Sequence, residues 1–139
     1  MVTDEARNFN WLLSSFVDET AGVSDALAVS SDGVLIARSN TLDRDQSEQL
    51  CAIISSSASL AHAADRAMEA DGVERVIIAM QLGFLFVSAI ADGSCLGVVA
   101  TRDCDVGSVG YQTTELVGRV GVLLTPALRE ELKQLASST

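Results

Sequence analysis

The sequence predicts a single α+β domain, built as a three-layer α/β/α sandwich with the element order αββαβββα. Two Asp-Gly dipeptides, Asp32-Gly33 and Asp92-Gly93, are each flanked by apolar runs. This pattern is typical of tight antiparallel hairpins, because Asp-Gly supplies the positive φ angles that the turn needs. Between the hairpins, residues 43–71 contain neither glycine nor proline, which indicates one long helix. With 139 residues, the chain is long enough for one domain with its own core.

A first helix is predicted over residues 4–20, because its apolar side chains recur along one side and Gly22 follows closely. The first hairpin then pairs residues 26–30 with 34–39. The second of these strands is apolar on both faces, so we expect both faces of the sheet to be covered by helices. The apolar side of the first helix consists of Phe9, Leu12, Leu13, Phe16 and Val17.

The long helix has either Thr41 or Asp43 as its N-cap, and Asp71-Gly72 ends it. Its apolar and small side chains cover more surface than one face of a sheet can bury. We therefore expect a second seam along the helix, where the same helix of a symmetric partner approaches closely. The predicted seam consists of Leu50, Ile54, Ser57, Ala61, Ala64 and Met68.

Three further strands are predicted over residues 74–80, 84–91 and 95–101, which completes a five-stranded, mostly antiparallel sheet. In the middle strand, Phe84, Phe86 and Ile90 point to one face, and Leu85, Val87 and Ala89 point to the other. The strand over 74–80 starts a new sheet segment directly after the long helix. A free edge there is an aggregation hazard unless it pairs with another copy, so Val76 and Ile78 are predicted at a homodimer interface.

A third helix runs from the cap Asp105 to about Leu124, and a tail helix covers about 126–136. We expect one domain over residues 1–139, with a core region of about 4–124. The long helix packs on one face of the sheet, and the first and third helices pack on the other. Glycine is unfavourable inside a helix, so the glycines of the third helix are expected to permit close contact with the sheet. They are Gly107, Gly110, Gly118 and Gly121.

The composition argues against several classes of partner. Nineteen acidic against nine basic residues give a net charge of −10, which disfavours nucleic acids and anionic lipid surfaces. The most apolar run, residues 76–91, is too short and too interrupted to cross a membrane, and the N-terminal segment lacks the apolar region of a signal peptide. We therefore expect a cytoplasmic protein without direct membrane insertion.

The sequence offers no active site or cofactor site. Its single histidine, His62, has only Asp65 at helical spacing, and one such pair cannot hold a metal ion. There is no G-x-S-x-G nucleophile motif and no P-loop. The three cysteines, Cys51, Cys95 and Cys104, are odd in number and lack metal-site spacing, so we expect reduced thiols. A non-enzymatic protein without metal or cofactor is the expectation.

Three segments together resemble a known family. They are the hairpin VSSDGVL over residues 29–35, the Leu-, Ile-, Ser- and Ala-rich helix over 48–67, and LGVVATRDCDVGSVGYQ over 96–112, followed by LLTPALR over 123–129. In this order they resemble the Roadblock family of dynein-light-chain-like domains, and specifically its actinobacterial branch associated with small GTPases. The resemblance implies a profilin-like fold and a homodimer whose third strands pair into one continuous sheet.

The same resemblance implies a function. It points to a regulator or scaffold of a small Ras-like GTPase, with a possible GTPase-activating role. The resemblance also implies an operon-encoded complex with a membrane sensor-kinase-like protein. That protein would hold this one at the membrane periphery. The acidic residues Glu48 and Asp65 of the long helix are the predicted contacts for the GTPase. The alternative is an α/β/α domain that senses a small molecule bound in its core. That alternative needs a cavity lined by polar groups.

Overall fold

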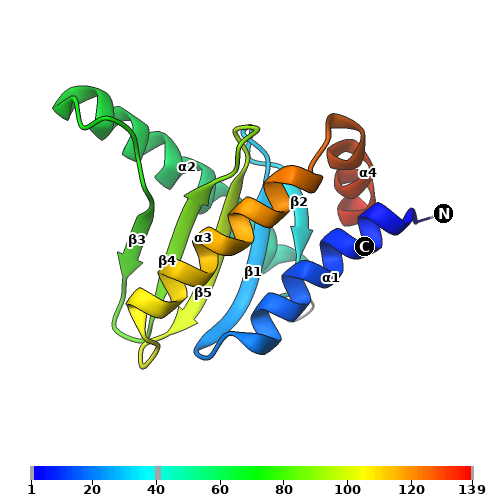
Figure 1. Cartoon of the computed structure of the whole chain (residues 1–139), viewed down its shortest axis with the longest axis horizontal. Helices are drawn as coiled ribbons and strands as arrows, with labels where there is room; N and C mark the ends of the chain where they lie inside the picture. Colours follow the sequence, from blue (N-terminus) through cyan, green and yellow to red (C-terminus); the bar gives the residue numbers. More distant parts are fainter. Residues whose placement is uncertain (1, 40–41, 139) are drawn as a thin grey trace.

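The computed structural model describes residues 2–39 and 42–138, and it confirms the predicted element order. The sheet is five-stranded and antiparallel, with the strand order β2-β1-β5-β4-β3 (Figure 1). The last helix, α4, forms the predicted tail. The elements are α1 (Asp4–Glu19), β1 (Val23–Val29), β2 (Leu35–Arg38), α2 (Arg44–Met68), β3 (Val76–Ala79), β4 (Gly83–Ala89), β5 (Cys95–Thr101), α3 (Val106–Leu123) and α4 (Pro126–Ser137).

Helices cover both faces of the sheet, as expected from its apolar strands. Figure 1 shows α1 and α3 on one face and α2 behind the other. Phe84, Phe86 and Ile90 belong to the cluster under α1, α3 and α4. Leu85 and Val87 belong to the separate cluster under α2. The predicted alternation along β4 is therefore confirmed, and the two clusters form the two apolar layers of the sandwich.

The helix ends follow from local capping. The Asp43 carboxylate accepts a hydrogen bond from the Gln46 backbone N–H at 2.8 Å, and the Gln46 side chain accepts one from the Asp43 N–H at 3.4 Å. This capping box starts α2, while Thr41, the other predicted cap, lies outside the described residues. The helix ends at Met68 rather than at Asp71, because Glu69 and Asp71 adopt left-handed φ angles of 51° and 63°.

The position of α2 over the sheet depends on one close contact. Ile54 is fully buried and lies against Gly97 in the central strand β5. A Cβ atom at position 97 would overlap the Ile54 side chain. Only glycine therefore allows this part of α2 to come so near the sheet. The contact sets both the distance of α2 from the sheet and its rotation about its own axis.

The glycines of α3 correct one prediction. Gly121 does lie close to the sheet, since a Cβ there would be 3.6 Å from Ile90 Cγ2. Gly110 is buried beneath the guanidinium group of Arg75 instead. Gly107 and Gly118 are exposed, and a Cβ at position 118 would meet nothing within 4 Å. Close packing against the sheet thus does not explain Gly107 or Gly118.

Helix α4 lies beside the edge strand β2 (Figure 1), where Leu128 and Leu132 are buried in the core and basic side chains add polar contacts. Arg129 forms an ion pair with Asp92 at 2.9 Å, and Lys133 lies 3.9 Å from Asp32. The aspartates of both Asp-Gly turns therefore face basic residues of α4. Partial burial acts to raise the pKa of Asp92, but hydrogen bonds from Ser94 and Arg129 outweigh it and hold that pKa below its usual value. These pairs add to the burial of Leu128 and Leu132, which anchors the tail helix across one edge of the sheet.

The cysteines are free thiols in the structure. Cys51 lies in the cluster under α2, and Cys95 lies in the same cluster at the start of β5. Burial, with a smaller contribution from the Glu48 carboxylate, raises the pKa of Cys51 to about 11. A thiol with such a pKa stays protonated at neutral pH, so Cys51 is a packing residue rather than a nucleophile.

The contact between Ile54 and Gly97 can be tested by adding volume. Gly97→Val should lower the free energy of unfolding by about 1–3 kcal/mol, because the new side chain overlaps Ile54. Ile54→Ala in the same chain should recover part of this loss. As a control, Gly118→Ala should raise stability by up to about 1 kcal/mol, since it improves helix propensity without a clash. Urea unfolding measures the free energy of unfolding of the wild type, the two single variants and the double variant. Equal stability of Gly97→Val and wild type would contradict the proposed role of the contact.

The Cys51 thiol predicts a pH dependence of stability. Its pKa is raised in the folded state from 9.0 to about 11, so the folded protein holds this proton more tightly than the unfolded chain does. The contribution is therefore fully present below pH 9 and is lost as the pH rises to about 11. Urea unfolding of wild type and Cys51→Ala across this range measures it. The wild type should lose more stability than Cys51→Ala as the pH rises. If the stabilities of the two proteins fall in parallel with pH, the raised pKa of Cys51 is refuted.

Candidate protein interface

The two edges of the sheet are unlike each other. Beside β2 lies α4, as described above. At the other edge, β3 pairs with β4 alone among the described residues, and its outer side is open in Figure 1. Val76 and Ile78 are half-buried against the cluster under α2, whereas Ile77 on the other face is 42% exposed. The unpaired backbone of β3 can therefore accept another strand.

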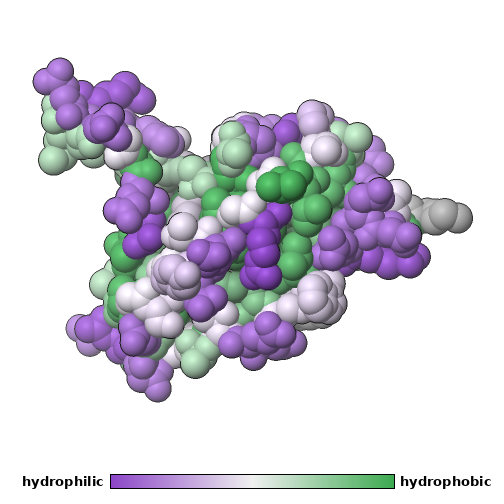
Figure 2. Space-filling view, viewed as in Figure 1, coloured by the Kyte–Doolittle hydropathy of each residue, from purple (hydrophilic) through white to green (hydrophobic). Residues whose placement is uncertain are grey.

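The C-terminal half of α2 extends beyond the sheet and is exposed (Figure 1). Of its 25 residues, those buried are Ser47, Cys51 and Ile54, all in the first half. Leu60 is 72% exposed and Met68 is 74% exposed. In Figure 2, pale green apolar residues lie beside hydrophilic ones at this free end of the helix. An exposed apolar helix next to an open strand edge is the arrangement expected at a protein–protein interface.

The structure divides the predicted seam of α2 into two parts. Leu50 is half-buried and packs on the protein's own sheet, and Ile54 is fully buried there, so Ile54 was wrongly placed on an outward face. Ser57 and Ala61 are half-buried, and Ala64 and Met68 are exposed. The large outward apolar side chains that the seam omitted are Ile53 and Leu60, which share the spacing i, i+4, i+7, i+11 with Ser57 and Ala64. We call Ile53, Ser57, Leu60, Ala64 and Met68 the outer seam.

The two predicted GTPase contacts are not brought together. Glu48 is exposed near the start of α2, where its carboxylate forms an ion pair with Arg44 at 3.4 Å. Asp65 is half-buried near the end of the helix, and it accepts a hydrogen bond from the Gly72 N–H at 2.8 Å. At 1.5 Å per residue, they are separated by about 25 Å along the axis. Asp65 therefore has a structural role in the turn after α2, and Glu48 is the more accessible acid.

Among the described residues, His62 and the possible metal ligands are the side chains with the most characteristic chemistry. His62 is exposed on α2, in a shallow hollow shared with Ser55 and Ser59. Among the residues that the structure describes, no three His, Cys, Asp or Glu side chains are grouped so that they could hold a metal ion. No helix in this part of the chain is long and apolar enough to cross a membrane. The open edge of β3 and the exposed half of α2 together form the strongest candidate site.

Comparison with solved structures places this fold among known ones. The Roadblock/LC7 domain from Streptomyces avermitilis is 31% identical, with a TM-score of 0.75 over 80% of this chain and 92% of that one. MglB from Myxococcus xanthus has a TM-score of 0.77 at 11% identity, over 90% of this chain and 96% of that one. Profilin from Schizosaccharomyces pombe has a TM-score of 0.54 at 16% identity, over 82% of this chain and 98% of that one. The last two likenesses show the fold alone, which is profilin-like as predicted.

The search of curated proteins found no match. The family model described as the Roadblock/LC7 domain matches residues 9–100, which run from α1 to β5 and include the open strand and the whole of α2. The predicted resemblance is thus confirmed, and the chain belongs to the Roadblock/LC7 domain family.

Proposed function

We propose that this protein is a non-enzymatic homodimer that regulates or scaffolds a small Ras-like GTPase. The observation that carries the dimer is the asymmetry of the sheet. One edge has a helix beside it, while the other edge is open and adjoins the exposed half of α2. Pairing of two β3 strands about a two-fold axis would satisfy the free backbone groups and extend the sheet across both copies.

The same symmetry would use the outer seam of α2. The helix projects beyond its own sheet on the β3 side, so in a dimer joined at β3 it would lie over the partner's half of the continuous sheet (Figure 1). The outer seam would then pack against the partner's α2. Its serine and alanine residues leave room for the two helices to approach closely. Val76 and Ile78 would continue the apolar layer across the new strand pair.

Family membership and charge support a small GTPase as the partner. The net charge of −10 favours a partner with a basic surface, and α2 carries exposed acids that include Glu48. Glu48 and Asp65 remain the proposed contacts for the GTPase. The family resemblance also suggests that a membrane sensor-kinase-like protein is part of the same complex. We propose that the protein acts by holding and orienting the GTPase. A GTPase-activating effect would then arise through groups of the GTPase itself.

The alternative of a small-molecule sensor with its ligand in the core has weaker support. Both layers of the sandwich are filled by apolar side chains. Within the described ranges, the buried side-chain polar atoms without a hydrogen-bond partner are Ser88 Oγ and Arg75 Nε. Two scattered atoms do not form a polar-lined cavity, so the dimeric regulator is preferred.

The dimer predicts a clear effect of charge in the outer seam. Leu60→Glu should convert the dimer to a folded monomer. Leu60 is exposed in the isolated protomer, so glutamate is tolerated there, whereas in the dimer its carboxylate would be a buried charge. Val122→Glu is the matched control, since Val122 is equally apolar and exposed but lies on α3, on the opposite face of the sheet. Sedimentation equilibrium at micromolar concentration measures both. A monomeric wild-type protein would rule out the proposal.

The GTPase contact predicts a charge-dependent association rate. Glu48→Lys should slow association with the proposed small-GTPase partner, and rising salt from about 50 to about 500 mM should slow the wild type similarly. Asp65→Asn tests the second acid, together with circular dichroism because Asp65 also holds the Gly72 N–H. Glu115→Lys, an exposed acid on α3, is the control. Association rates are measured by stopped flow. If Glu48→Lys and Asp65→Asn leave the rate unchanged, these two acids are only solvated surface residues.

A further inference from the structure

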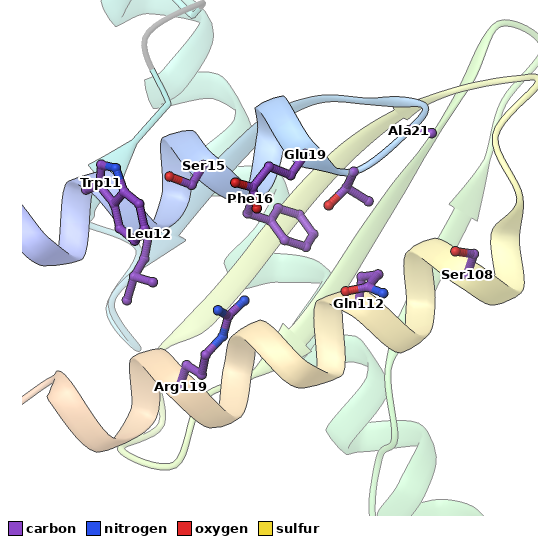
Figure 3. Close-up of a pocket in the computed structure, with 10 residues that line it drawn as sticks. Trp11, Leu12, Ser15, Phe16, Glu19, Ala21, Ser108, Gln112 and Arg119 are labelled. Carbon is purple, nitrogen blue, oxygen red and sulfur yellow. The ribbon is translucent and has the colours of Figure 1, made fainter.

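A groove of about 380 Å³ lies between α1 and α3, on the face of the sheet opposite α2. Figure 3 shows side chains from both helices directed into it. Leu12 and Phe16 of α1, both buried, form its apolar floor. Trp11 and Glu19 border it from α1, and Arg119 borders it from α3. In Figure 2 the green surface between these helices shows that apolar side chains are accessible there.

Trp11 is unusual in its exposure. It is the only tryptophan of the chain, and it is 61% exposed although it lies beside a buried apolar floor. No hydrogen bond of its indole N–H is formed with the described residues. Exposed tryptophan beside apolar surface is enriched at binding hot spots, because its large ring becomes buried when a partner covers it.

Arg119 supplies a charge that the protein itself leaves unpaired. In Figure 3 its guanidinium group points from α3 toward α1, across the groove. Within the described part of the chain it forms no ion pair or hydrogen bond, although Glu115 is one turn away and Glu19 borders the same groove. Most other basic residues are engaged, as in the pairs of Arg44 and Arg129. An unpaired guanidinium beside apolar surface complements a carboxylate.

We propose that this groove binds a short segment of a further protein, in which an acidic side chain lies near a bulky apolar one. The carboxylate pairs with Arg119, and the apolar side chain packs on Trp11, Leu12 and Phe16. Glu19, the last residue of α1, repels a second acid at its end of the groove and so fixes the direction of the bound segment. The groove is on the face away from α2, so this binding is independent of the proposed dimer and of the proposed GTPase contacts.

Other occupants fit the groove less well. A site for a small molecule buries most of its ligand, whereas the exposed indole of Trp11 shows that this groove is an open trough. Nucleic acid is disfavoured by Glu19 at the groove and by the net charge of −10. The groove offers an apolar floor, one cation and polar walls that include Ser15, Ser108 and Gln112, and a protein segment with mixed apolar, acidic and polar groups can match all three.

The test begins with selection of peptides from a random phage library on the full-length protein. The selected sequences should combine Asp or Glu with a nearby Trp, Phe, Leu or Met. Synthetic versions of these peptides, with any tryptophan replaced by phenylalanine, are then titrated while the fluorescence of Trp11 is recorded, which reports on the groove alone because neither the peptide nor the rest of the chain then contains another tryptophan. Binding should shift its emission to shorter wavelength as the ring becomes buried. Higher salt should weaken binding.

Charge reversal then tests the assigned contacts. Arg119→Glu should weaken peptide binding at least tenfold, whereas Arg66→Glu, at an exposed arginine of α2 outside the groove, should not change it. Circular dichroism verifies the fold, and Arg119→Gln replaces Arg119→Glu if that variant unfolds. Failure to select peptides, selected peptides without an acid, or equal affinity for the Arg119 variants would overturn the proposal. Sedimentation of the same samples reports the dimer separately, so either proposal can fail alone.

Discussion

The contact between Ile54 and Gly97 is the constraint on which the exposed surface of this protein depends. Because β5 is the central strand and has no side chain at position 97, α2 can press one residue into the sheet at that point. This fixes the rotation of α2. With Ile54 inward, Ile53 points about 100° away from it around the helix axis, and Leu60 lies on the same side as Ile53 because seven residues make about two turns; both side chains are exposed. The packing of one core residue thus determines which apolar side chains a partner can meet.

The sequence predicted the fold well because its signals are local. The Asp-Gly turns and the run of residues 43–71 without glycine or proline indicate the element order, and alternation along β4 gives its two faces. The seam of α2 was harder to predict, because two sets of residues share one helical spacing. One set contains Leu50 and Ile54, and the other contains Ile53 and Leu60. Periodicity alone cannot separate them, since only the opposing glycine of β5 decides which set is buried.

The α1–α3 groove could not be predicted from the sequence for a related reason. Arg119 and Trp11 lie far apart in the chain, and each has an ordinary surface explanation when considered alone. Their relation arises only when α1 and α3 pack on the same face of the sheet and leave the buried Phe16 between them. The absence of an ion pair to Glu115, one turn away on α3, is also a property of side-chain positions rather than of spacing.

The distribution of charge supports separate roles for the two faces of the sheet. Around the hairpin tips, the aspartates are neutralised within the chain, because Arg129 pairs with Asp92 and Lys133 lies near Asp32. Together with the buried Leu128 and Leu132, these contacts hold α4 beside β2, so the tail helix hinders strand addition at that edge and leaves β3 as the free one. A second copy joined there would leave the opposite face, with Arg119 and Trp11, open in both protomers. Such a dimer would present two equivalent grooves on one side and the paired α2 helices on the other, which is the geometry required of a scaffold that holds different partners at once.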